Sequence, residues 1–146
     1  VGHSLGGMAC GYYLKHYASS VQDLVLLSTP SGLSDMMYRY FDILSLSHEM
    51  MPPLEQLFLD RYNINASKFS TANHLIGCGL DGVIVHDETD AITPYVESLQ
   101  INQAWSKSNH IATKGLGHSL KDHRIINGIC NYITHGELPI SVRIDS

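Results

Sequence analysis

The chain has 146 residues, the length of one ordinary domain, and its 44% hydrophobic and 16% charged content is typical of a globular protein. Nine Lys and Arg against fourteen Asp and Glu give a net charge of −5, and no basic run is present, so we expect no nucleic-acid partner. No apolar run is long enough for a membrane span, and no signal peptide is visible. Three widely spaced cysteines argue against a disulfide framework and favour a reducing, cytoplasmic location.

The chain begins with a short glycine-rich motif. Gly2-His3-Ser4-Leu5-Gly6 fits the pattern G-x-S-x-G, in which a serine occupies a sharp turn between a strand and a helix. The strand and the helix pass close to such a serine, so glycines on both sides supply room and backbone freedom. The first N–H groups of the helix would favour negative charge beside the serine hydroxyl.

The strand that such a turn requires is nearly missing from the sequence. Only Val1 remains before the motif, and the chain does not start with methionine. We therefore expect residues 1–146 to be a fragment of one domain whose amino-terminal strands are absent.

The first half of the chain predicts a helix, a strand and a helical insertion. Residues 4–18 predict a helix that is apolar nearly all round at its start and therefore buried. Residues 23–28 are a short apolar run, typical of a strand buried on both faces of a parallel sheet. Residues 34–75 predict short helices at 35–41 and 53–59, separated by a break at Met50-Met51-Pro52-Pro53.

The second half alternates strands and helices. Residues 82–86 predict a strand, and a polar turn at 87–94 ends in Pro94, which can start a helix to about Trp105. Residues 110–113 predict a third strand, followed by a glycine-rich loop. A last helix is expected over 119–134, with one buried face made of Leu120, Ile125, Ile126, Ile129, Cys130 and Ile133. This alternation predicts an α/β fold with a parallel sheet flanked by helices.

Three residues of complementary chemistry follow the expected strands. Ser4, Asp90 and His118 each lie just past a strand, and the carboxyl ends of parallel strands share one edge of the sheet. A serine hydroxyl becomes an effective nucleophile when an imidazole takes its proton, and a carboxylate orients that imidazole. The order serine, acid, histidine is the one required of enzymes with this type of turn.

These motifs together resemble the carboxyl-terminal half of an α/β-hydrolase. The match has three parts. The first is the turn around the serine at 2–7, which in this family is called the nucleophile elbow. The others are the acid-rich turn at 85–94, called the acid turn below, and the histidine loop Gly115-Leu116-Gly117-His118. The resemblance implies Ser4 as nucleophile, Asp90 as acid and His118 as general base, with the backbone N–H of Leu5 as an oxyanion donor. The family's loop that supplies a second donor is missing from this sequence.

The resemblance also implies that residues from about 34 to 75 form a helical cap over the site. Such caps shape the substrate pocket, so four residues of the first cap helix are candidate pocket lining; the alternative is that they only pack the cap helix. These candidates are Met36, Met37, Tyr40 and Phe41.

Other interpretations of individual residues are weaker. Asp87 competes with Asp90 for the acid role, but Asp90 matches the family position and lies nearer the following helix. His118, Asp122 and His123 could suggest a metal site, yet no second cluster supports it, so we expect no metal and no cofactor. His3 is interpreted as a packing or hydrogen-bonding residue, and His86, on a strand, as a satisfied core or edge histidine and not a ligand.

The sequence thus predicts a serine hydrolase that cleaves an ester, thioester or amide of a small acyl substrate through an acyl-enzyme. The alternative is a non-catalytic binder of a small ligand that keeps the same fold. Esterase, lipase, thioesterase, peptidase and acyltransferase are not distinguished, and the sequence does not indicate an oligomeric state. We expect residues 1–146 alone to be inactive or insoluble, and the complete parent protein to be active.

Overall fold

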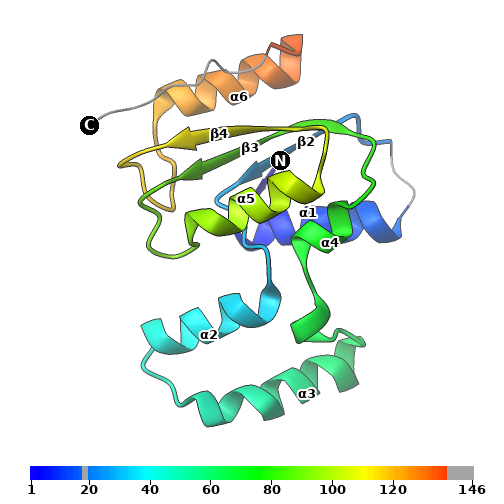
Figure 1. The fold of residues 1–146 in the computed structure, drawn as a ribbon, viewed down its shortest axis with the longest axis vertical. Helices are drawn as coiled ribbons and strands as arrows, with labels where there is room; N and C mark the ends of the chain where they lie inside the picture. Colours follow the sequence, from blue (N-terminus) through cyan, green and yellow to red (C-terminus); the bar gives the residue numbers. More distant parts are fainter. Residues whose placement is uncertain (18–19, 138–146) are drawn as a thin grey trace.

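The structure, a computed structural model, describes residues 1–17 and 20–137. Its four strands form one parallel sheet, in which the spatial order β1-β2-β3-β4 follows the chain. Figure 1 shows β2, β3 and β4 of this sheet. The strands are β1 (Gly2–His3), β2 (Asp23–Leu27), β3 (Asp81–Asp87) and β4 (Ser108–Thr113). The predicted α/β fold with a parallel sheet is confirmed.

Helices cover both faces of this sheet. Helix α6 (His123–His135) lies on one face, and α1 (Leu5–His16), α4 (Thr71–Leu75) and α5 (Tyr95–Ala104) lie on the other (Figure 1). Neighbouring residues of β3 point to opposite faces, so Val83 and Val85 pack under α6 while Ile84 packs with Trp105. The central strands β2 and β3 are therefore buried on both sides, as their continuous apolar runs predict.

The connection from β2 to β3 forms a separate helical layer. It contains α2 (Leu33–Ile43), the short 3₁₀ helix η1 (His48–Met50), α3 (Met51–Tyr62) and the 3₁₀ helix η2 (Ala66–Lys68). Figure 1 shows α2 and α3 on the far side of α1, α4 and α5 from the sheet. The predicted helices exist but are longer, and the two prolines lie in the first turn of α3, where their missing N–H groups are not needed.

Two short segments join this layer to the rest of the chain, and we call them the neck: Ser31 and Gly32 lead into the layer, and Ser70 and Thr71 lead out of it. Gly32 and Ser70 form an isolated antiparallel bridge, and the Thr71 N–H donates to the Ser31 carbonyl at 2.8 Å. Helix α4, beyond the neck, packs against α1 and α5. We call the separate helical layer, residues 33–69, the cap. It is shorter than the predicted range of about 34–75, because α4 belongs to the layer next to the sheet.

The expectation of a fully buried first helix is wrong for the described residues. Leu5 is 57% exposed and Tyr13 is 47% exposed, and only Gly7, Met8 and Gly11 of α1 are buried. Strand β1, which precedes α1, is at the edge of the described sheet, so α1 packs against α4 on one side only.

The last helix starts later than predicted, and its apolar residues divide between two faces. Asp122 caps α6 by accepting the Arg124 N–H at 2.8 Å, which fixes the helix start. Leu120 lies in the preceding loop with φ 49° but is buried beside Ile125. The residues of α6 buried against the sheet are Ile125, Ile129 and Tyr132, whereas Ile126, Cys130 and Ile133 are exposed.

Within the described ranges, no helix has the length and apolar character needed to cross a membrane.

Candidate active site

Ser4 occupies a sharp turn between β1 and α1. Its φ of 53° and ψ of −124° are sparsely populated by residues with a side chain, and such strain persists only where the surroundings hold it. The Ser4 N–H donates to the Leu27 carbonyl at 2.8 Å, and the Ser4 carbonyl accepts from the Gly7 N–H at 2.9 Å. This backbone has the strand–turn–helix form that the G-x-S-x-G pattern predicts.

Two glycines give this turn its room. A Cβ atom on Gly2 would lie 2.6 Å from the Gly7 Cα, and a Cβ atom on Gly7 would overlap the Thr29 side chain. A Cβ atom on Gly6 would meet nothing within 4 Å among the described residues. The close packing expected on both sides of Ser4 therefore involves Gly2 and Gly7, and not Gly6.

The structure brings Ser4, His118 and Asp90 into one hydrogen-bonded line. His118 Nε2 lies 3.0 Å from Ser4 Oγ, and His118 Nδ1 lies 2.8 Å from Asp90 Oδ2. The three residues come from the segments that follow β1, β3 and β4. A carboxylate only accepts, so Nδ1–H donates to Asp90, and the Ser4 hydroxyl can then donate to the lone pair of Nε2.

The turn after β3 holds the Asp90 carboxylate in place. Its side chain is fully buried, whereas that of His118 is 21% exposed. Asp90 Oδ1 accepts from the N–H groups of Ile92 at 2.8 Å and Thr93 at 2.9 Å. These two bonds leave Oδ2 for the imidazole of His118 and fix the direction in which it points.

His86 lies next to Asp90, a position that the sequence did not reveal. Its Nε2 donates to the Thr93 carbonyl at 2.8 Å and lies 3.5 Å from Asp90 Oδ2. Its Nδ1 is buried and has no hydrogen-bond partner. Burial lowers the pKa of His86 although the Thr93 hydrogen bond and the nearby Asp90 act to raise it, so burial favours the neutral ring. The interpretation of His86 as a hydrogen-bonded core residue therefore holds for one nitrogen only.

Asp87 has a different set of partners. Its Oδ1 accepts from the N–H and hydroxyl of Thr89, and its Oδ2 accepts from the Thr113 hydroxyl at 2.8 Å and the Leu116 N–H at 2.9 Å. Burial by itself would raise the pKa of Asp87, but these bonds outweigh burial and lower the pKa below its ordinary value. Asp87 thus joins the acid turn to the histidine loop and does not contact His118.

His3 contacts the histidine loop from the other side. Its Nε2 donates to the His118 carbonyl at 2.8 Å, and the two rings are 5.1 Å apart. Gly115 and Gly117 of this loop have φ of 86° and 60°, the left-handed region that glycine adopts without strain. The loop that carries His118 is therefore held by bonds to both the elbow and the acid turn.

The four candidate pocket residues are not equivalent. Met36, Met37 and Phe41 are buried in a cluster that joins α2 to Met8 of α1 and to Met51 and Ala66 of the cap, whereas Tyr40 is 40% exposed. These contacts pack the cap helices together and against α1, and a role in lining a substrate pocket stays a prediction.

No metal site is evident in the part of the chain that the structure describes. Over residues 1–17 and 20–137, no three His, Cys, Asp or Glu side chains are grouped so that they could hold a metal ion. Asp122 is already paired with Arg124. Its Oδ2 accepts from Arg124 Nη2 at 2.9 Å, and its Oδ1 accepts from the Arg124 N–H at the start of α6.

Solved structures with this arrangement of strands and helices are α/β-hydrolases, and the chain has their fold. The esterase domain of a Rhodothermus marinus protein has a TM-score of 0.59 at 16% identity, over 83% of this chain and 50% of that one. A meta-cleavage product hydrolase from Pseudomonas fluorescens IP01 has a TM-score of 0.63 at 12% identity, over 93% of this chain and 64% of that one. A serine hydrolase from Cycloclasticus zankles has a TM-score of 0.59 at 14% identity, over 93% and 63%.

This likeness is one of structure and not of sequence. No protein-family model matches the chain, and no curated protein matches it. The chain spans about half to two thirds of the length of the solved proteins named above. The comparisons therefore show the α/β-hydrolase fold and no particular activity.

Proposed function

We propose that Ser4, His118 and Asp90 are the catalytic triad of a serine hydrolase that cleaves an ester, thioester or amide bond. The observation that carries the proposal is the line from Ser4 Oγ through His118 to Asp90, with distances of 3.0 and 2.8 Å. A nucleophile, a base and an orienting carboxylate in hydrogen-bond contact are the groups that acyl transfer requires.

In the first step, Ser4 Oγ attacks the substrate carbonyl carbon while His118 Nε2 takes the hydroxyl proton. Asp90 stabilises the imidazolium that forms. The carbonyl oxygen becomes negative beside the N–H of Leu5, the first residue of α1, which has no acceptor within the helix. This N–H would be one of the oxyanion donors.

In the following steps, His118 returns the proton. It protonates the leaving alcohol, thiol or amine as the carbonyl–heteroatom bond breaks, and the acyl group stays on Ser4. His118 then takes a proton from water as the water attacks the acyl-enzyme, and Ser4 is released with its proton restored. The substrate is accordingly a small molecule with an acyl group, and its identity depends on the pocket.

We further propose that activity belongs to a complete hydrolase domain of which residues 1–146 are one part. The chain spans 50% of the Rhodothermus esterase domain and 64% of the Pseudomonas hydrolase. Loss of a single oxyanion donor typically lowers the rate by about 10²–10³-fold. Residues 1–146 expressed alone are therefore expected to give no robust ester hydrolysis, and robust hydrolysis would contradict this part of the proposal.

A fluorophosphonate probe tests the triad directly, because it reacts with activated serines. The full-length protein that contains residues 1–146 should be labelled, and Ser4→Ala should abolish labelling. Ser106→Ala, which changes an exposed serine, is the matched control and should be labelled like the unmodified protein. A well-folded full-length protein that is not labelled would support the small-ligand binder instead.

A further inference from the structure

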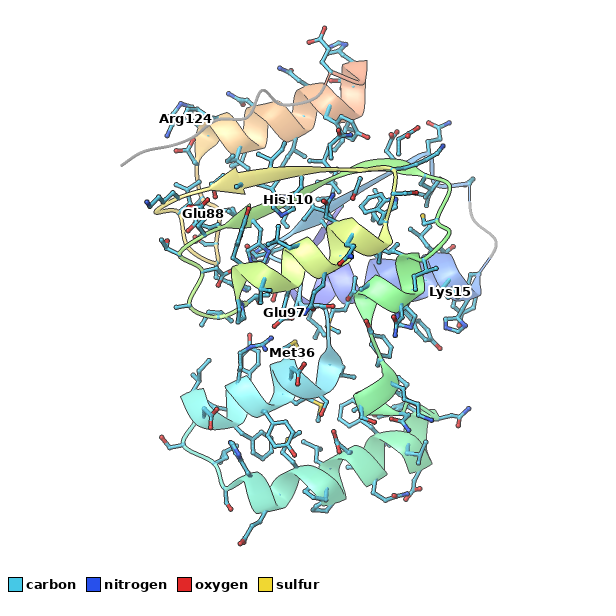
Figure 2. The ribbon with its side chains drawn as sticks, in the orientation of Figure 1. Lys15, Met36, Glu88, Glu97, His110 and Arg124 are labelled. Carbon is cyan, nitrogen blue, oxygen red and sulfur yellow. The ribbon has the colours of Figure 1, made fainter. Side chains whose placement is uncertain are left out.

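Arg39 of the cap reaches across to the layer next to the sheet. Its Nη1 donates to Glu97 Oε1 of α5 at 2.7 Å, and its Nε donates to the Ile92 carbonyl at 3.1 Å. Figure 2 shows Glu97 on the side of α5 that faces α2, and Met36 on the side of α2 that faces α5. The Arg39 side chain therefore forms an ion pair with α5 and a hydrogen bond with the turn that carries Asp90.

Glu97 is the centre of this contact. Its side chain is only 8% exposed, and its second oxygen, Oε2, accepts from the Ser31 N–H at 2.6 Å. Ser31 belongs to the neck between β2 and the cap, so one carboxylate holds both the neck and the first cap helix. A buried carboxylate that loses its charged partner is strongly destabilised, which keeps Arg39 in place.

Ile92 links this contact to the triad. Its carbonyl accepts from Arg39, and its N–H donates to Asp90 Oδ1 at 2.8 Å. Asp90 Oδ2 in turn holds His118. A continuous series of hydrogen bonds thus runs from α2 through Ile92 and Asp90 to His118.

Stabilisation of the fold does not by itself account for this arrangement. Buried ion pairs are often no more stabilising than apolar residues of the same size. Arg39 Nη2 is also buried without a hydrogen-bond partner, which adds a cost. What the pair does supply is a fixed direction, because the planar guanidinium bonds Glu97 and Ile92 at the same time.

We propose that Arg39 and Glu97 form a latch that fixes cap helix α2 against the acid turn and thereby positions Asp90 for catalysis. Arg39 is then a positioning residue that acts through Ile92. This inference rests on the proposed serine-hydrolase function. It adds that the position of the cap and the activity of the triad are coupled.

The test separates the number of competent sites from the reactivity of each site. The full-length protein is titrated with a small fluorophosphonate, which gives the fraction of molecules labelled and the rate constant per labelled site. The variant Arg39→Met/Glu97→Gln removes both charges and keeps an acceptor for the Ser31 N–H. We expect its labelled fraction to stay near that of the unmodified protein and its rate per site to fall about 10- to 100-fold, because small misplacements of catalytic groups cost this much.

Arg61→Met is the matched control, since Arg61 is an exposed arginine of the same cap, and it should leave both quantities unchanged. A loss of labelled fraction with an unchanged rate per site would mean a purely structural pair and would overturn the latch. Failure of the unmodified protein to be labelled would instead contradict the proposed function.

Arg39→Lys carries the test if the double variant does not fold. Lysine keeps the positive charge next to Glu97 but lacks the planar fork that reaches Ile92. We expect a folded protein with a reduced rate per site, and a rate equal to that of the unmodified protein would overturn the latch.

Discussion

Asp87 and Asp90 are three residues apart in one turn, yet their carboxylates face different parts of the molecule. Asp90 accepts from the imidazole of His118 at 2.8 Å, and Asp87 accepts from the backbone N–H of Leu116 at 2.9 Å. One carboxylate thus contacts the proposed catalytic base, and the other fixes the loop on which that base lies. This division of partners separates the effects of substitutions at the two positions.

Asn substitutions at Asp90 and Asp87 should affect different properties: the first should lower kcat, and the second should lower stability. Asp90→Asn removes the charge that stabilises the imidazolium and should lower kcat by about 10⁴-fold with little change in stability. Asp87→Asn places an NH₂ group among donors and should cost about 1–3 kcal/mol of stability. Steady-state kinetics and thermal unfolding of the full-length protein measure both. A larger loss of kcat per folded molecule in Asp87→Asn than in Asp90→Asn would reverse the assignment of the acid.

The stabilising effect of Asp87 should disappear in acid. Its pKa is lowered in the folded state, so the unfolded chain binds more protons once the pH falls below the ordinary carboxyl pKa, and folding is then penalised. The stability difference between the unmodified protein and Asp87→Asn is therefore expected to be full above about pH 5 and to shrink at lower pH. Urea unfolding at a series of pH values measures this difference, and a difference that grows in acid would contradict the bonding described for Asp87.

Two neighbouring glycines of the elbow should respond differently to alanine. Gly7→Ala forces a Cβ atom into the Thr29 side chain and should destabilise the protein by about 1–3 kcal/mol. Gly6→Ala meets nothing within 4 Å among the described residues and should be neutral or slightly stabilising, because alanine favours a helix. Thermal unfolding gives both values. Thr29→Ala should partly rescue Gly7→Ala, and the absence of any rescue would mean that the collision is elsewhere.

His86 should make the protein less stable in weak acid. Burial lowers the pKa of His86 in the folded state, so its neutral form is favourable above the ordinary histidine pKa of 6.5. As the pH falls below that value, the unfolded chain gains a proton first and stability decreases. His86→Gln keeps a donor for the Thr93 carbonyl, whereas His86→Phe does not. Both variants should lose this part of the pH dependence between pH 7 and 5, but only the Phe variant should also lose stability at pH 7.

The alternation of strands and helices and the approach of Ser4, Asp90 and His118 could be predicted from the sequence. Strands such as β3 are continuous apolar runs bounded by turns, and the elbow needs glycines at fixed positions, so both leave local patterns. The parallel order then places the ends of β1, β3 and β4 at one edge, which is enough to predict that Ser4, Asp90 and His118 approach one another.

The exposure of each helix and the partners of each polar group were decided only by the tertiary structure. The sequence does not show that Ile126 faces away from the sheet while Ile125 is buried, or that Arg39 pairs with Glu97 across 58 positions. Burial and pairing depend on which elements pack together, and that is settled by long-range contacts and the free energy of desolvation. Local patterns therefore determine where the residues of the proposed triad lie along the chain, and packing determines what surrounds them.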